Sequence, residues 1–328
     1  MSVLKASVIV PTYRYPGVVD CLEVLSRQNY TDYEVIVVDD GSCDESVGIV
    51  KNFVKGKKKF RFIVFDKNRG PAAVRNAGVK KAKGDVVLFT DSDCKPCMDW
   101  VSKMMKPFSD SSVAGVSGTY RTWNDESVVA RFVGYEIALR HERMAKRKKI
   151  DFIGTFCAGY RRSVFLAEGG FDEKFSIASG EDTEFSYRLA SKGHKMIFVK
   201  DAWVYHRHPD SVWRYMKQKF WRGFWRVRLY RKHTKKVKGE SYTPFNVLVQ
   251  IPLFFVFVAT TVVSPFIGII GYALSVAIAL VIILLNILEG ARMMKYEKSM
   301  ICVAPMLLSA RTVASGLGVA LGFIRRKF

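Results

Sequence analysis

Short, nearly continuous apolar runs recur in the first 90 residues of the chain. The runs that we expect to be strands cover residues 7–10, 34–38, 61–65 and 85–89. β-Branched runs without polar alternation are typical of parallel strands that are buried on both faces. Segments of helical period and length separate them, at about residues 17–28, 43–54 and 71–82. This alternation predicts right-handed crossovers and a doubly wound α/β sheet.

The C-terminal third of the chain carries a different pattern. Residues 247–288 contain no charged side chain. Within them, residues 247–263 and 266–288 supply 17 and 23 residues, which is near the roughly 20 that a membrane-spanning helix requires. We expect two spans joined by a tight connection at residues 264–265. A pair of buried core helices is the alternative, but the chain left to cover them is short.

A third, less apolar segment covers residues 300–324. It contains Arg311 and a pattern of small residues at 318–322, which can pack helices together in lipid. A third crossing would export the basic residues 325–327, against the positive-inside rule. We therefore expect an amphipathic helix at the membrane surface, with a third membrane helix as the alternative.

The boundary between the two patterns lies near residue 238. We expect one domain over residues 1–238 and a membrane domain over residues 239–328. Basic side chains flank the uncharged stretch at residues 235–238 and 292–298, which places both flanks in the cytoplasm. No signal peptide is recognisable at the N-terminus. The expected localisation is the cell membrane, multi-pass, with the N-terminal domain on the cytoplasmic side.

The net charge of +22 is concentrated just before the uncharged stretch. Residues 207–238 hold twelve Lys or Arg and one acid, Asp210, interleaved with aromatic side chains. Aromatic and basic side chains together suit a surface of anionic membrane lipids. The same mixture can bind nucleic acid, but the chain has no recognised reader motif. We expect anionic lipids as partners, and no nucleic acid.

Cysteine use and composition exclude several classes of protein. The six cysteines are sparse, which suits a reducing compartment. Cys94 and Cys97 form a lone C-x-x-C pair that lacks the rest of a zinc set, so a structural metal or a redox dithiol there is the less favoured interpretation. Intrinsic disorder, a collagen-like repeat and a disulfide scaffold do not fit the composition.

Polar and acidic side chains follow three of the expected strands. Residues 11–14 follow the first, Asp39 and Asp40 follow the second, and Asp91 and Asp93 follow the strand at 85–89. Ligands of open α/β sheets bind outside the carboxyl ends of the strands. A single Asp-Gly-Ser could be only a turn, but three such ends together favour a ligand site.

The two carboxylates of Asp91 and Asp93 lie at i and i+2 of an extended segment, where they point the same way. Neighbouring carboxylates repel and are stable together when a cation lies between them. Oxygen ligands of this kind suit Mg²⁺ or Mn²⁺ completed by phosphate oxygens. Upstream of this pair, Arg75 lies one turn into a helix that begins at Pro71, where it can attract a phosphate.

Five motifs together resemble family 2 glycosyltransferases. They are SVIVPTY at residues 7–13, VVDDGSCD at 37–44, NRGPAAVRNAG at 68–78, GDVVLFTDSD at 84–93 and GFDEKFSIASGEDTEFSYRL at 170–189. The resemblance covers roughly residues 5–225. It implies a GT-A fold with a Rossmann-like, mostly parallel sheet, followed here by an α-helical membrane hairpin. It also implies a nucleotide-diphosphate sugar donor, UDP- or GDP-linked, a divalent metal, and inversion at the anomeric carbon.

The same resemblance implies a role for individual residues. The residues that would bind the donor are Pro11, Tyr13, Asp39, Asp40, Asn68, Arg75, Asp91 and Arg222. Asp91 and Asp93 would hold the metal, with His206 as a third ligand and His208 as the competing candidate. Asp182, in the Glu-Asp pair at 181–182, would be the general base, because the acceptor hydroxyl must lose a proton as it attacks. Residues 156–160 would shape the acceptor side.

The chain is thus expected to be a membrane-anchored inverting glycosyltransferase whose acceptor is lipid-linked, either a polyprenyl phosphate or a lipid-linked glycan. Holding both reactants at a surface lowers the entropic cost of their encounter. A processive polysaccharide synthase is the nearest alternative, although two spans are few for a polymer channel. A catalytically inactive membrane scaffold of the same fold is the alternative from another class.

Overall fold

The computed structural model describes residues 4–175, 180–234, 236 and 239–325. The chain divides into two compact units. The first contains residues 1–123 and 141–207, and the second contains residues 124–140 and 208–328. This division differs from the predicted boundary at residue 238, because two segments from before that point pack with the C-terminal helices.

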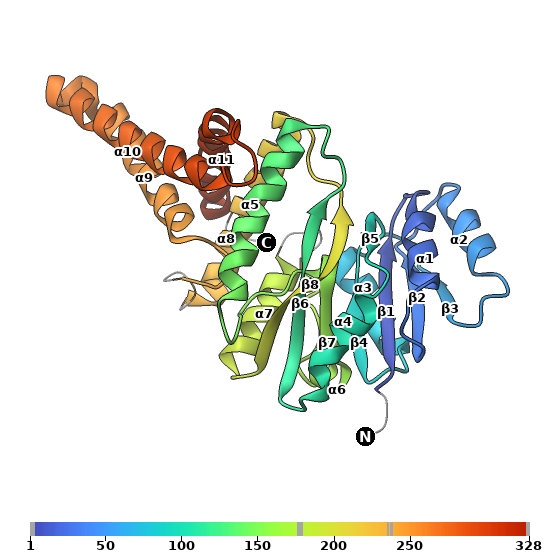
Figure 1. The fold of residues 1–328 in the computed structure, drawn as a ribbon. Helices are drawn as coiled ribbons and strands as arrows, with labels where there is room; N and C mark the ends of the chain where they lie inside the picture. The colour runs from blue at the N-terminus through green and yellow to red at the C-terminus, as the bar shows by residue number, and fades with distance from the viewer. Residues whose placement is uncertain (1–3, 176–179, 235, 237–238, 326–328) are drawn as a thin grey trace. The chain divides into compact units, whose positions relative to one another are not determined.

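The first unit is built on one eight-stranded sheet with the order β3-β2-β1-β4-β7-β6-β8-β5 (Figure 1). The strands are β1 Ala6–Thr12, β2 Tyr33–Asp39, β3 Phe60–Val64, β4 Val86–Phe89, β5 Cys94–Pro96, β6 Val113–Thr122, β7 Ala158–Arg161 and β8 Lys195–His206. β1 to β4 pair in parallel, as do β6 and β8, whereas β7 and β5 pair antiparallel to their neighbours. The sheet is therefore mixed, with a parallel half.

Helices connect the strands of the parallel half. The helices that belong wholly to this unit are α1 Val18–Ser26, α2 Ser46–Val54, α3 Pro71–Lys81, α4 Trp100–Met105, α6 Arg162–Ala167 and α7 Glu181–Ser191, with 3₁₀ turns at Lys106–Ser109 and Thr155–Cys157. The four strands and three helices expected from the pattern are present, with ends that differ from the expectation by three residues or fewer.

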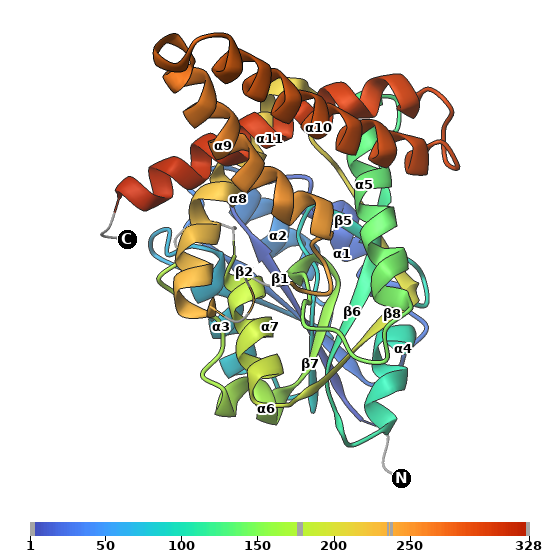
Figure 2. The same cartoon turned by 90° about the vertical axis from the view of Figure 1, so that its left-hand side faces the viewer.

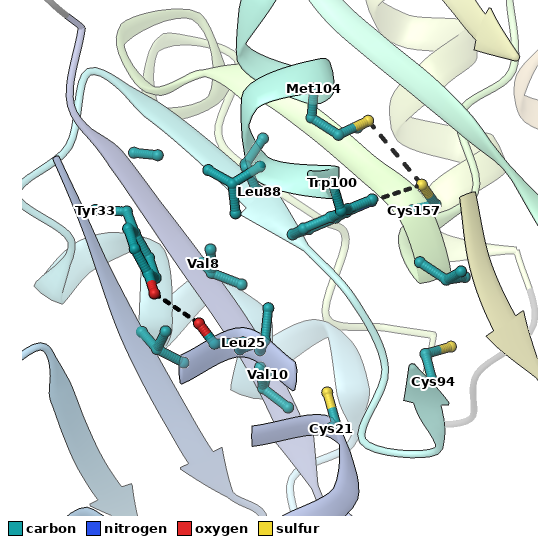
Figure 3. Packing of buried hydrophobic residues seen from close by; sticks show 14 of the residues in the cluster. Val8, Val10, Cys21, Leu25, Tyr33, Leu88, Cys94, Trp100, Met104 and Cys157 are labelled. Carbon is teal, nitrogen blue, oxygen red and sulfur yellow. Dashed lines mark hydrogen bonds between the residues drawn. The ribbon is translucent and has the colours of Figure 1, made fainter. Parts of the chain in front are cut away.

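Both faces of the parallel half are covered, as uninterrupted apolar strands require. Val8 and Val10 of β1 join α1 and α4 in one apolar cluster, which Figure 3 shows around Trp100. The indole Nε1 of Trp100 donates a hydrogen bond to Cys157 Sγ at 3.0 Å. On the other face, Ile9 contacts α3 at Gly78, where a Cβ would lie 2.5 Å from the isoleucine side chain.

The second unit is helical. It contains α8 Val212–Lys232, α9 Phe245–Ile267, α10 Ile269–Met293 and α11 Met300–Ile324. It also takes residues 128–140 from α5, Val128–Ala145. α9 and α10 run side by side in both views (Figures 1 and 2), and α11 packs along α8.

Three helices in the described part of the chain are long and apolar enough to cross a membrane: α9, α10 and α11. The expected span 247–263 falls inside α9, and the expected span 266–288 overlaps α10 but begins three residues before it. The expected connection at Ser264-Pro265 is wrong, because both residues lie within α9. The chain turns instead at Gly268, whose φ of 68° is a left-handed conformation that favours glycine. Of the expected basic flank at 235–238, residues 235, 237 and 238 lie outside the described residues.

Candidate functional site

The end of β2 is shaped by two adjacent carboxylates with different partners. Asp39 accepts hydrogen bonds from the backbone N–H and the hydroxyl of Ser42, both at 2.7 Å. Its carboxylate therefore closes the turn that follows the strand, which is the local role that Asp-Gly-Ser favours. Asp40 reaches across to the next loop.

Asp40 accepts hydrogen bonds from the backbone N–H groups of Arg69 and Gly70 at 2.7 and 2.9 Å. Burial raises the pKa of Asp40, and these two N–H groups oppose that effect. The side chain thus fixes the loop that enters α3 at Pro71. Asn68, in the same loop, is exposed.

The first strand ends with residues open to solvent. Tyr13 is 42% exposed, and Pro11 is half-buried at the carboxyl end of β1. The guanidinium of Arg14 lies over the Tyr13 ring at 5.3 Å from its centroid. An exposed aromatic ring at the carboxyl edge of a parallel sheet is available to stack on a planar ligand.

Arg75 links two of the predicted site segments. Its Nη2 donates to Asp91 Oδ1 at 2.7 Å, and its Nη1 donates to Glu181 Oε1 at 2.9 Å. Burial by itself would lower the pKa of Arg75, but Asp91, Glu181 and Asp182 together raise it. Three acids, one from the loop after β4 and two from α7, therefore act on one buried guanidinium, and the predicted general base lies near the predicted D-x-D motif.

Glu181 is the buried member of the acidic pair, with 2% of its surface exposed. Burial raises its pKa to about 7, and the neighbouring Asp182 adds to this. Asp182 is less buried, and its Oδ1 accepts hydrogen bonds from Thr183 N and Thr183 Oγ1 at 2.6 and 3.1 Å. Both acids stand in the first turn of α7, where the helix dipole favours negative charge.

The start of α7 is held in place by packing behind it. Phe185 of α7 contacts Phe165, Phe171 and Tyr160, and Phe89 at the end of β4 joins the same aromatic cluster. Each of these rings is almost completely buried. The cluster fixes α7 against the strand that leads to Asp91.

Asn76 anchors the loop before α7. Its Oδ1 accepts from Phe171 N and its Nδ2 donates to Phe171 O, both at 2.9 Å. A Cβ on Gly170 would lie 2.6 Å from this amide, so a glycine is required for the close approach. Residues 176–179, which belong to the motif at 170–189, lie outside the described residues.

Four potential metal ligands meet at the end of β4. One ligand atom each of Asp91, Asp93, Cys94 and His206 lies within 4.8 Å of the others. His206 Nε2 is 3.7 Å from Asp93 Oδ2. Burial raises the pKa of Asp93, Asp91 raises it further, and His206 opposes this shift. Two carboxylates and an imidazole fit Mn²⁺ or Mg²⁺ with places left for phosphate oxygens.

The pairing of two short strands brings His206 to this cluster. β5 follows the D-x-D motif directly and pairs antiparallel with the end of β8, with Cys94 opposite His206. His208 is not a member of the cluster. It is paired through its backbone with Asn124, by bonds of 2.9 Å in both directions.

Two features of the site were not predicted from the sequence. The ion pair of Arg75 with Glu181 joins residues that are 106 positions apart, and no local pattern indicates it. Cys94 lies among the potential metal ligands, although the sequence analysis disfavoured a metal role for the C-x-x-C pair. Residues 156–160, expected on the acceptor side, are buried. Arg222 belongs to the second unit, so its contact with a donor stays a prediction.

Comparison with known proteins gives a consistent picture. The family model described as Glycosyl transferase family 2 matches residues 7–167. Glycosyltransferase AglE of Haloferax volcanii is 27% identical over 201 residues, which cover 60% of this chain and 64% of that protein. An N-acetylglucosaminyltransferase of Neorhizobium galegae is 28% identical over 232 residues, covering 65% of this chain and 53% of the relative. The matches thus span less than two thirds of these relatives.

Solved structures share the fold. The mannosyltransferase PcManGT from Pyrobaculum calidifontis, in complex with GDP-Man and Mn²⁺, aligns with a TM-score of 0.67 at 19% identity, over 97% of this chain and 87% of its own. Residues 1–349 of S. aureus TarS, in complex with UDP-GlcNAc, align with a TM-score of 0.52 at 23% identity, over 63% and 60% of the two chains. The likeness confirms the GT-A fold expected from the motifs.

Proposed function

Since residues 7–167 form a family 2 glycosyltransferase domain, we propose that the protein transfers a sugar from a nucleotide-diphosphate donor, with inversion, to a lipid-linked acceptor. The observation that carries the proposal is that acids from α7 and from the loop after β4 gather around Arg75. One of them, Asp91, also belongs to the cluster that contains Asp93 and His206. Such a group of side chains suits a diphosphate and a cation.

The donor would lie along the carboxyl ends of β1, β2 and β4. Tyr13 is exposed enough to stack on a base, and the proposed donor site also includes Pro11, Asp39, Asp40, Asn68, Arg75 and Asp91. Asp91, Asp93 and His206 would hold Mn²⁺ or Mg²⁺. The cation would neutralise the charge that develops on the departing diphosphate. PcManGT, crystallised with GDP-Man and Mn²⁺, supports this assignment by analogy of fold.

Asp182 would be the general base. The acceptor hydroxyl attacks the anomeric carbon, the bond from that carbon to the diphosphate oxygen breaks, and the hydroxyl proton passes to Asp182. Thr183 orients the carboxylate through two hydrogen bonds. Glu181, tied to Arg75, would position this turn of α7 without taking the proton.

The acceptor is inferred from the second unit. The outer surfaces of α9 and α10 carry large exposed apolar side chains, among them Phe266 at 86% and Ile269 at 82%, as a hairpin in lipid requires. We propose two crossings and a surface position for α11, whose Arg311 is ion-paired with Glu136 of α5. A lipid-linked acceptor would then lie in the same membrane as the enzyme.

The decisive experiment uses membranes that contain the full-length protein. They are incubated with radiolabelled UDP- and GDP-sugars, with and without Mn²⁺, and the lipids are then extracted. We expect Mn²⁺-dependent label in the lipid fraction, and a loss of at least 100-fold in Asp182→Asn, because general-base catalysis contributes about 10²–10⁴-fold. Glu23→Gln, which removes an exposed acid of α1, is the matched control and should keep full activity.

The alternatives give different results in the same assay. A processive polysaccharide synthase would place the label in polymer that does not extract with lipid. An inactive scaffold would transfer no sugar from any donor, and full activity of Asp182→Asn would remove the proposed base.

A further inference from the structure

A cluster of buried charged side chains lies within the second unit. The carboxylate of Glu136 in α5 accepts hydrogen bonds from three cations: Arg140 of the same helix at 2.7 Å, Lys219 of α8 at 2.8 Å, and Arg311 of α11 at 2.8 Å. Each of the four side chains is 8% exposed or less. Three helices thus meet at one ionic centre.

The cluster carries more positive than negative charge. Among the described residues, Glu136 is the only acid that pairs with these three cations, so the formal charge of the group is +2 (three cations less one carboxylate). Arg311 also donates to Gln250 of α9 at 2.6 Å, which adds no charge. Buried ions are costly unless they are paired and fully hydrogen-bonded.

Lys219 shows the effect of this burial. Burial lowers its pKa to about 7, and Arg222 and Arg140 lower it further, although Glu136 acts in the opposite direction. A carboxylate partner ordinarily raises the pKa of a lysine. Here burial outweighs that effect, and the two arginines act in the same direction as burial.

Two buried donors in the cluster have no hydrogen-bond partner among the described residues. They are Nε of Arg140 and the hydroxyl of Tyr215, whose residues are 6% and 0% exposed. Lys219 Nζ lies 4.8 Å from the centroid of the Tyr215 ring, and Glu136, Arg311 and Arg140 all influence the Tyr215 pKa, which burial raises. An unsatisfied buried donor costs about 1–3 kcal/mol, and here such donors coincide with surplus positive charge.

We propose that this cluster binds a phosphate group, and that the phosphate is the headgroup of an anionic lipid. The acceptor oxygens of a phosphate can take hydrogen bonds from the two unpartnered donors, and its negative charge can offset the surplus positive charge. Arginine side chains are well suited to bind phosphate. The second unit also carries the apolar helices α9 and α10, which favours a lipid over a free ion. This inference rests on the membrane attachment proposed above.

The test measures binding, without sugar transfer. Full-length protein in neutral detergent is titrated with dioctanoyl phosphatidic acid, with inorganic phosphate, and with dioctanoyl phosphatidylcholine, whose phosphate charge is offset by choline. We expect phosphatidic acid to raise the melting temperature and to bind at least tenfold more tightly than either other probe. Because the readout needs no donor sugar, its failure is distinguishable from failure of the proposed transferase activity.

Two variants locate the site. Tyr215→Phe removes a hydroxyl that makes no hydrogen bond to any described residue, so the variant should fold normally and bind phosphatidic acid at least fivefold more weakly. Lys219→Gln, which lowers the surplus positive charge of the cluster, should also weaken the binding of phosphatidic acid. Tyr135→Phe is the control, since the Tyr135 hydroxyl bonds Glu297 elsewhere in the same unit, and its affinity should equal that of the wild type.

Each remaining outcome contradicts part of the proposal. Equal binding of inorganic phosphate and phosphatidic acid would show that the ligand is a free phosphate and overturn the lipid assignment. Equal binding of phosphatidylcholine, or wild-type affinity in both Tyr215→Phe and Lys219→Gln, would overturn the site itself.

Discussion

At the scale of single residues, the candidate site depends on Arg75. Its side chain is 4% exposed and pairs with two carboxylates, that of Asp91 just after β4 and that of Glu181 in α7. A buried ion that loses its partner is strongly destabilising, because the desolvated charge is left uncompensated. The same side chain therefore supports both the fold of the first unit and the diphosphate site that we propose.

We predict that Arg75→Met lowers the free energy of unfolding by about 3–5 kcal/mol, since Asp91 and Glu181 lose a buried partner. Thermal unfolding of the purified protein measures this. Arg69→Met is the control: Arg69 is 54% exposed in its pair with Glu173, and exposed pairs contribute about 1 kcal/mol or less. Similar losses in the two variants would contradict the structural role of Arg75.

At the scale of elements, α8 and α11 approach each other through small residues. A Cβ on Gly318 would lie 2.0 Å from the backbone oxygen of Phe220, and one on Gly322 would lie 2.8 Å from that of Phe224. The pattern at residues 318–322 was read from the sequence as a helix-packing motif, and the structure identifies α8 as its partner.

Gly318→Val should therefore push α11 away from α8. We expect it to lower the melting temperature by several degrees, because overpacking costs about 1–3 kcal/mol or more. Leu317→Val places the same side chain at a neighbouring position that is 52% exposed and should change little. A melting temperature for Gly318→Val equal to that of Leu317→Val would show that the two helices need no close contact.

A partly buried ion pair between Arg131 and Glu297 joins α5 to the segment between α10 and α11. Hydrogen bonds from Arg131 and from Ser299 lower the pKa of Glu297 to about 2. Because the folded pKa lies below the usual value of 4.5, this group stabilises the protein above pH 4.5, and the contribution is lost as pH falls towards 2.

We predict that Glu297→Gln flattens the dependence of stability on pH between about 4.5 and 2. The difference from wild type should be about 1 kcal/mol or less, since at least a quarter of each side chain is open to solvent, which screens the pair. Denaturant unfolding at a series of pH values measures it. Parallel pH profiles for the two proteins would mean that the pair contributes nothing.

At the scale of the whole molecule, the open question is how many times the chain crosses the membrane. Among the described residues, three helices, α9, α10 and α11, are long and apolar enough to cross a membrane. Arg311, in the middle of α11, is 4% exposed and paired with Glu136, which is unfavourable for a helix surrounded by lipid. Two crossings also keep the basic flanks on one side.

Cysteine labelling in sealed vesicles tests this arrangement. In a Cys302→Ser background, we expect exposed Cys43 to react with an impermeant maleimide only from the cytoplasmic side. A cysteine introduced by Gly268→Cys, at the turn between α9 and α10, should react only from the opposite side. Reaction of both positions from the same side would exclude the proposed hairpin.

The sequence by itself determined the local structure and the chemistry at the strand ends. Apolar runs and helical periods are local properties, so β1 to β4 and α1 to α3 were predicted to within three residues and the apolar helices α9 and α10 to within five. The exception was the connection at residues 264–265. A proline at position 265 suggests a break, but α9 continues through Pro265 to Ile267. In a membrane, neighbouring helices can compensate for the hydrogen bond that a proline removes. The chain reverses at Gly268 instead.

Only the tertiary structure decided which distant residues act together. The pairing of β5 with β8 brings His206 into the cluster of potential metal ligands, and the packing of α7 brings Glu181 to Arg75. The cluster around Glu136 joins residues up to 175 positions apart. Such contacts follow from strand pairing and helix packing across the chain, and no short stretch of sequence contains the information that fixes them.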